Sequence, residues 1–164
     1  MTRDYVVIDN RSQSMPNVQF AELIAAVLSK GKPFRFQAKG FSMSPFIQDE
    51  DIVTLSPLRN KIKLGEVIAS FESNKRLYLH RVVKISHEKF LIRGDNVSIV
   101  DGWQFRDDML GYVTRIERQS KNIRFGLGSE RVIIAILSAR GWLMPIFAVL
   151  KKVRWINNWF SRGF

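Results

Sequence analysis

The sequence predicts a mainly β protein, with an amphipathic helix before the β-rich part and an apolar helical segment after it. Between residues 33 and 125, short runs of β-branched and aromatic residues alternate with polar ones and are separated by turn-forming residues, which is typical of antiparallel strands. The residues before this part show helical spacing of apolar side chains. We therefore expect an N-terminal arm and helix over residues 1–32, a β-rich domain over 33–125 and a C-terminal helical segment over 126–164.

The composition excludes several classes of function. The chain has 164 residues, of which 46% are hydrophobic, so it can bury a core. The absence of cysteine excludes disulfides, thiolate catalysis and cysteine zinc sites, and two histidines are too few for a histidine-rich metal site. We therefore expect no metal and no cofactor. The formal net charge of +11 predicts attraction to polyanions, either nucleic acid or an anionic membrane.

The N-terminal region predicts a short strand or arm, DYVVI, followed by one helix. The first ten residues do not form a signal peptide, because the apolar run is short and lies between Asp4 and Asp9. We therefore expect a cytoplasmic protein. A helix is expected from Asn17 to Ser29, and Gly31 is its stop signal. Its apolar stripe consists of Phe20, Leu23, Ile24, Val27 and Leu28.

The central part predicts a series of short strands. They are expected within residues 33–40, 51–57, 65–73, 76–86, 89–94, 110–118 and 122–126. The stretch from 95 to 109 is expected to be a loop. In the long strand 76–86, period-2 alternation places His80 on the same face as Tyr78 and Arg81 on the opposite face. Several short strands with turn residues between them fit an all-β body.

One turn in this series contains a candidate nucleophile. The motif GFSMSP lies between two expected strands and includes Ser42. A serine becomes a nucleophile when a base takes its proton, and His80 can accept a proton at neutral pH. A carboxylate would orient the histidine. Taken alone, these residues are also typical of a surface turn, a packed strand histidine and a solvated loop. The carboxylates of the following loop are Asp95, Asp101, Asp107 and Asp108.

The order of these motifs resembles the signal peptidase superfamily of serine peptidases, which also includes the self-cleaving phage and SOS repressors. GFSMSP resembles the nucleophile motif of that superfamily and implies Ser42 as the nucleophile. HRVVKI begins with His80, where bacterial signal peptidases have a lysine base; a histidine there is similar to the endoplasmic-reticulum and archaeal type. GDN, at residues 94–96, resembles a turn of both types. Asp101 stands where the endoplasmic-reticulum enzymes have their orienting aspartate, and Asp95 is the other candidate.

The resemblance implies a signal-peptidase/SOS-repressor-like β body that performs acyl transfer. Ser42 would attack a peptide carbonyl, and His80 would take the proton and return it to the leaving amine while Asp101 holds the imidazole. The implied partner is a peptide or protein substrate that binds extended, by adding to a strand near the site. Backbone N–H groups of the turn would stabilise the oxyanion. The implied substrate and oxyanion region consists of Gly40, Phe41, Met43 and Ser44.

The C-terminal residues 129–164 predict contact with an anionic membrane surface. Residues 132–150 are about long enough to span a bilayer, but Arg140 lies at their middle, where it costs about 2.5–3.5 kcal/mol on insertion. Basic residues beside tryptophan and phenylalanine are typical of a helix in the membrane interface. The alternatives are a helix pair packed on the β body and a true span. We expect a location on the inner face of the membrane, as a peripheral protein.

Two other functions remain as alternatives. A non-catalytic basic β domain would bind anionic membrane or nucleic acid, but the basic residues are scattered and no aromatic–basic RNA motif occurs, so nucleic acid is not the expected partner. A self-cleaving repressor would need a DNA-binding domain ahead of Ser42, where the sequence predicts one clear helix. Its base would also be a lysine, whereas here a histidine stands in that position.

Overall fold

The computed structural model describes residues 6–8, 17–71, 77–97 and 102–149 of the chain. Its helices are α1 (Asn17–Ser29) and α2 (Arg131–Ala139), and η1 (Arg106–Asp108) is a short 3₁₀ turn. Its strands are β1 (Val6–Ile8), β2 (Phe34–Gln37), β3 (Ile52–Pro57), β4 (Val67–Phe71), β5 (Leu77–Ser86), β6 (Lys89–Arg93), β7 (Trp103–Phe105), β8 (Met109–Arg118) and β9 (Lys121–Ile123).

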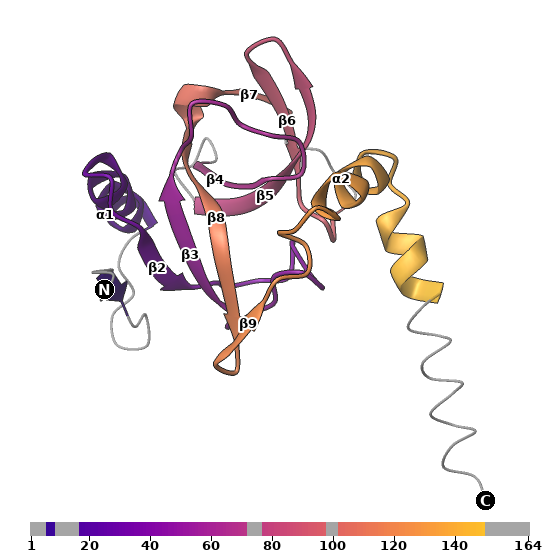
Figure 1. The fold of residues 1–164 in the computed structure, drawn as a ribbon, viewed down its shortest axis with the longest axis horizontal. Coiled ribbons are helices and arrows are strands. Elements are labelled where there is room, and N and C mark those ends of the chain that lie inside the picture. The colour runs from indigo at the N-terminus through magenta and orange to yellow at the C-terminus, as the bar shows by residue number, and fades with distance from the viewer. Residues whose placement is uncertain (1–5, 9–16, 72–76, 98–101, 150–164) are drawn as a thin grey trace, which may run out of the picture.

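The strands form one strongly curled sheet, which is antiparallel except for the pairing of β1 with β2 (Figure 1). The strand order is β1-β2-β3-β8-β4-β5-β6-β7, and β9 pairs with the second half of β8. The long strand β8 pairs with β3 on one side and with β4 on the other, and so joins the two halves of the sheet. The mainly β class expected from the sequence is confirmed.

Most of the expected elements are found where the pattern predicted them. Helix α1 has the expected bounds, and each of the expected strand segments overlaps a strand of the sheet. Alternation succeeds because most strands have one face against a core. In β2, for example, Phe34 and Phe36 are buried while Arg35 and Gln37 are half-buried.

Strand β7 contradicts the expected loop over residues 95–109. It pairs with β6, but its apolar side chains point outward: Trp103 is 44% exposed and Phe105 is 52% exposed. The Nζ of Lys84 lies 5.8 Å from the Trp103 ring centroid and that of Lys89 lies 5.1 Å from the Phe105 centroid. The strand has only three residues, and its two apolar side chains are exposed. Its sequence therefore lacks the pattern of a buried face, which is why the sequence predicts a loop here.

The main core lies between α1 and the inner face of the sheet. The ring of Phe20 in α1 packs edge-on against Phe34 and Phe36, with centroids 5.8 and 5.7 Å apart. Further along α1, Ile24 and Leu28 are buried in the same cluster. The apolar stripe identified in the sequence is thus the side of α1 that packs against the sheet.

The C-terminal helices pack against the β body in a second, smaller cluster, separate from the main core that α1 covers. Helix α2 is followed by a second helix, Leu143–Val149, at an angle of 105°. Ile134 and Leu143 form a small core with Phe46 from the loop between β2 and β3. Among the described residues, no single helix has the length and apolarity needed to cross a bilayer, although this bent pair has them when both helices are taken together.

We predict that Gly65→Ala lowers the free energy of unfolding by more than Gly31→Ala. Both glycines have left-handed φ angles, +84° and +71°, which cost an L-residue about 1–2 kcal/mol. At Gly65 an added Cβ would also lie 2.4 Å from the carbonyl oxygen of Arg131, whereas at Gly31 it would meet nothing within 4 Å. Urea unfolding measures both variants. Equal losses would show that β4 and α2 do not approach closely at Gly65.

Candidate functional site

The loop between β2 and β3 holds Ser42, and acidic side chains keep that loop in shape. The backbone N–H of Gly40 donates to Asp49 Oδ1 at 2.8 Å, and that of Gln48 donates to Asp51 Oδ2 at 2.7 Å. Met43, which belongs to the implied substrate and oxyanion region, is buried in the main core and so anchors the loop. Asp49 and Asp51 therefore fix the backbone of the loop that carries Ser42.

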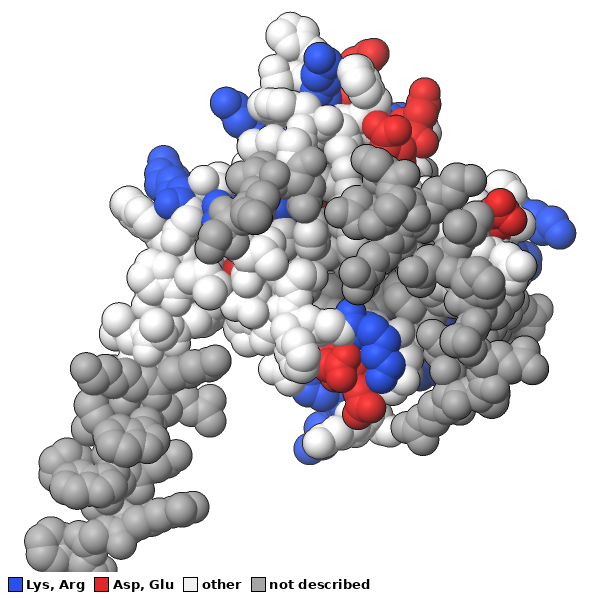
Figure 2. Space-filling model, turned by 180° about the vertical axis from the view of Figure 1, so that it is seen from behind, with Lys and Arg blue, Asp and Glu red and all other residues white. Residues whose placement is uncertain are grey.

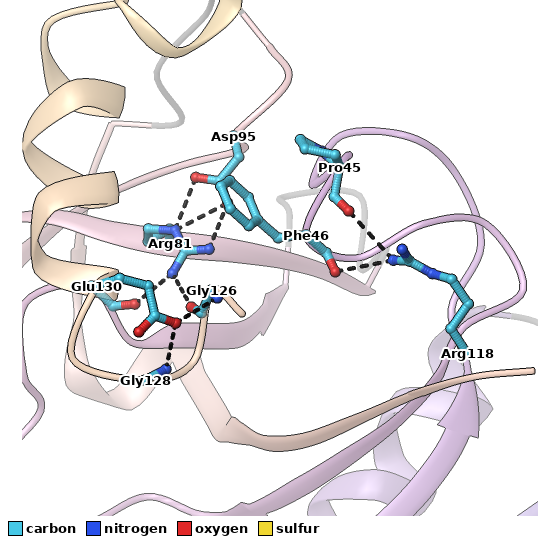
Figure 3. A network of polar contacts seen from close by, with 9 residues as sticks. Pro45, Phe46, Arg81, Asp95, Arg118, Gly126, Gly128 and Glu130 are labelled. Atoms are coloured by element: carbon cyan, nitrogen blue, oxygen red, sulfur yellow. Dashed lines mark hydrogen bonds and ion pairs between the residues drawn. The ribbon is translucent and has the colours of Figure 1, made fainter. Parts of the chain in front are cut away.

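Arg118 in β8 binds the same loop from its far side. Its guanidinium donates to both carboxylate oxygens of Asp51 at 2.8 Å. It also donates to the carbonyl oxygens of Pro45 and Phe46 at 3.3 and 3.2 Å (Figure 3). The hydrogen bonds to Asp51 raise the pKa of Arg118 above its ordinary value, so this charge persists at any physiological pH. The loop is thus tied to the centre of the sheet a few residues after Ser42.

The ring of His80 lies beside the Ser42 loop. His80 is buried in the middle of β5, and its ring is 4.8 Å from that of Tyr78, as the alternation predicted. Gly94 marks the meeting point: a Cβ there would lie 2.8 Å from His80 Nε2 and 2.8 Å from the Ser42 carbonyl oxygen. The first residue of the GDN motif is therefore a glycine because the imidazole and the Ser42 backbone occupy the space where a side chain would be.

The last residue of GDN bonds directly to the Ser42 loop. The backbone N–H of Asn96 donates to the Ser42 carbonyl oxygen at 2.7 Å, and its side-chain amide donates to the Phe41 carbonyl oxygen at 3.1 Å. These two bonds join segments that are more than fifty residues apart in the chain. They hold the serine turn and the strand pair that carries His80 in a fixed relation.

Arg81, next to His80 in β5, is the most connected side chain of this region (Figure 3). Both its guanidinium and the carboxylate of Asp95 are fully buried, and they form a bidentate pair with N–O distances of 2.7 to 3.0 Å. Its Nη1 also donates to the carbonyl oxygens of Gly65 and Gly126, both at 2.8 Å. The Phe46 ring centroid lies 5.2 Å from its Cζ.

The bonds of Asp95 support a structural role for this candidate. Burial raises the pKa of the Asp95 carboxyl, and the charge and hydrogen bonds of Arg81 act against that rise. Its oxygens receive three hydrogen bonds from Arg81, so this carboxylate holds Arg81 in place. Asp101, the other candidate for orienting His80, lies outside the described residues. Asp107 and Asp108 are exposed in η1, where Asp108 accepts from the Phe105 backbone.

The backbone N–H groups around Ser42 differ in their hydrogen bonding. Within the described part of the chain, no hydrogen-bond partner is found for the N–H of Ser42 or of Met43, whereas that of Ser44 donates to the Phe41 carbonyl oxygen at 3.1 Å. The Phe41 carbonyl oxygen also accepts from the Asn96 side chain, while the Phe41 side chain is 66% exposed.

Sequence reasoning missed three residues of this region: Arg81, Phe46 and Asn96. The alternation of β5 placed Arg81 opposite the face of His80, and a charged residue in a strand with apolar neighbours on both sides needs a buried partner. That signal predicts a partner but not which one. Asn96 has no signal beyond its place in the GDN motif and Phe46 has none beyond its place directly after GFSMSP, because their contacts depend on long-range packing.

Comparisons with known proteins do not add a family. No protein-family model matches the chain, and no curated protein matches it. The geometry of the site and the order of its motifs are therefore what supports a function.

We predict that Arg81→Met lowers the free energy of unfolding by about 3–5 kcal/mol, because it leaves the Asp95 carboxylate buried without a partner. Asp95→Asn removes that charge, so the double variant Arg81→Met/Asp95→Asn should lose less than the sum of the two single variants. Some loss remains, because the carbonyl oxygens of Gly65 and Gly126 lose their donor. A double-mutant cycle by urea unfolding measures the coupling; strictly additive losses would contradict the pairing.

We also predict a pH-dependent contribution from Glu130, whose carboxylate accepts the N–H groups of Gly126 and Gly128 at 2.7 and 2.9 Å. Hydrogen bonds from its own backbone and from these two glycines lower the pKa of Glu130. Its stabilising effect is therefore complete above the ordinary glutamate pKa of about 4.3 and is lost as the pH falls through the lower value in the folded protein.

Glu130→Gln should accordingly be less stable than the unmodified protein at neutral pH, and the difference should disappear in acid. Urea unfolding at several pH values measures the effect. Glu88→Gln, in the exposed turn between β5 and β6, is the matched control. A loss in Glu130→Gln that stays constant down to acid pH would contradict the role of the charge.

Proposed function

We propose that the protein is a serine peptidase with a signal-peptidase-like β body, which cleaves an extended peptide or leader segment. The observation that carries the proposal is at Gly94, where a Cβ would lie 2.8 Å from both His80 Nε2 and the Ser42 carbonyl oxygen, so the imidazole and the serine turn are close together. Acyl transfer needs a serine with a histidine beside it and N–H groups that can bind an oxyanion; the N–H groups of Ser42 and Met43 have no partner among the described residues. The order of motifs along the chain supports the same family.

In the proposed reaction, Ser42 Oγ attacks the carbonyl carbon of the scissile peptide bond while His80 accepts the hydroxyl proton. The N–H groups of Ser42 and Met43 stabilise the oxyanion; such a donor typically contributes about 10²–10³-fold to the rate. His80 then gives the proton to the leaving amine as the C–N bond breaks. A water molecule, deprotonated by His80, hydrolyses the acyl-enzyme and restores the Ser42 hydroxyl.

The environment of the histidine supports its role as a base held in one position. Its strand neighbour Arg81 is bonded to three other segments, so the backbone of β5 at His80 has little freedom to move. Asp101 is the residue that we assign to orient the imidazole, because Asp95 is already paired with Arg81. The substrate adds to the sheet in extended form, with the side chain of Phe41 as one contact.

We predict that a fluorophosphonate probe labels Ser42, because the oxygen of a serine activated by a neighbouring base attacks the phosphorus of the probe and displaces fluoride. Labelling should be lost in Ser42→Ala and in His80→Ala, and should persist in Ser44→Ala, the matched control from the same turn. Intact-mass and peptide-mass spectrometry measure the site and the extent. Cleavage of a native substrate should also be abolished in Ser42→Ala.

Urea unfolding of each variant separates loss of activity from loss of fold. A folded Ser42→Ala variant that is labelled as well as the unmodified protein, or that cleaves substrate at full rate, would refute the peptidase.

A further inference from the structure

The two C-terminal helices present an uncovered apolar surface, here called the outer helix face. Among the described residues it is the largest group of exposed apolar side chains on neighbouring elements. Ile133 and Val149 are the most exposed of them, at 63% and 61%. The outer helix face consists of Val132, Ile133, Ile136, Trp142, Met144, Ile146 and Val149.

The opposite side of the same helices is used for packing, so the orientation of the outer helix face is fixed. Ile134 and Ala135 of α2 are buried, and Leu143 of the second helix is buried beside Ile134 against Phe46. The carbonyl oxygen of Ser138 accepts a hydrogen bond from Arg93 in β6 at 2.8 Å, which ties the end of α2 to the sheet. The body thus holds the pair by one side, and the apolar residues of the other side remain exposed.

The charged residues within the two helices and the sequence after them are all basic. From Arg131 to the end of the chain there is no aspartate or glutamate, and Glu130, directly before α2, accepts hydrogen bonds from the N–H groups of Gly126 and Gly128. In Figure 2 the surface above the grey C-terminal atoms is mostly white, with few charged groups. At the bend between the helices, the guanidinium of Arg140 lies 5.9 Å from the ring centroid of Trp142, which is itself 57% exposed. The basic residues of this part of the sequence are Arg131, Arg140, Lys151, Lys152, Arg154 and Arg162.

We propose that the outer helix face binds the surface of an anionic lipid bilayer, with the apolar side chains among the acyl chains and the basic ones at the headgroups. An interfacial helix has an exposed apolar stripe, a tryptophan at its edge and basic residues beside it, and the outer helix face has all three. A lipid surface is favoured over a protein partner because residues 131–164 contain basic residues and no acid, which is complementary to anionic headgroups. The inference does not depend on the peptidase activity.

Binding there would bring the candidate site close to the lipid surface. The helices that carry the outer helix face pack on Phe46, which belongs to the same loop as Ser42 and contacts Arg81. A bilayer-bound molecule would therefore meet peptides that are themselves held at the membrane surface.

Vesicle co-sedimentation of the full chain tests the proposal. Vesicles of phosphatidylcholine with phosphatidylglycerol should bind the protein, phosphatidylcholine alone should bind it much more weakly, and added salt should weaken the binding to the anionic vesicles. Ile133→Gln and Val149→Gln should each weaken partitioning by about tenfold, because each removes an apolar side chain from the lipid contact. Arg140→Gln should weaken binding to the anionic vesicles alone.

Phe105→Gln is the matched control, since Phe105 is similarly exposed but lies on β7, and it should bind like the unmodified protein. Ser42→Ala should also bind normally, so failure of the lipid proposal and failure of the peptidase proposal are separate results. Equal binding of Ile133→Gln/Val149→Gln and the unmodified protein would overturn the proposal. A second result would also overturn it: the unmodified protein does not bind vesicles, and sedimentation velocity shows that it forms a dimer which the double variant does not form. That result would assign the outer helix face to contact with a second copy of the chain.

Discussion

The pair between Arg81 and Asp95 is the interaction on which the rest of the region depends. Two opposite charges with no exposure to water cost several kcal/mol each to bury, and the cost is recovered only when every donor and oxygen is bonded. The guanidinium of Arg81 also donates to the carbonyl oxygens of Gly65 and Gly126. It therefore binds both the turn before β4 and the segment after β9. A change in any of these segments would leave a charge unpaired. The contact therefore selects one arrangement of turns that are distant in the chain.

This fixed arrangement of the turns explains why His80 and Ser42, thirty-eight positions apart in the chain, both lie next to Gly94. His80 precedes Arg81 on the strand, and Gly94 precedes Asp95 in the turn, so fixing one pair of neighbours fixes the other. Asn96 extends the same turn by two bonds to the Ser42 loop. Arg81 and His80 are neighbours on β5, so their side chains lie on opposite faces of the strand. Rigidity is thus supplied by residues that take no part in the proposed chemistry.

The sequence predicts the helices and strands better than it predicts the long-range contacts between them. Alternation locates strands with one buried face, and it fails at β7, where Trp103 and Phe105 point outward. The motif order singles out Ser42 and His80, but their proximity depends on the register of β5 with β6 and on the bonds of Asn96, which no local pattern encodes. The partner of Arg81 is likewise a product of long-range packing. The apolar C-terminal stretch predicts helices, whereas their bend and the side that packs on Phe46 follow from the body they meet.

The distribution of acidic residues links the folded core to the proposed lipid contact. Four of the described carboxylates pair with arginines within the body: Asp95 with Arg81, Asp51 with Arg118, Glu66 with Arg59, and Glu117 with both Arg35 and Arg115. The chain has no acid from Arg131 onward, and charges beyond about 8 Å are screened at physiological salt. The acid that directly precedes this part, Glu130, accepts hydrogen bonds from the N–H groups of Gly126 and Gly128. The charges that a headgroup meets at the outer helix face are therefore mostly positive, because the acids of the body are engaged with arginines and backbone N–H groups.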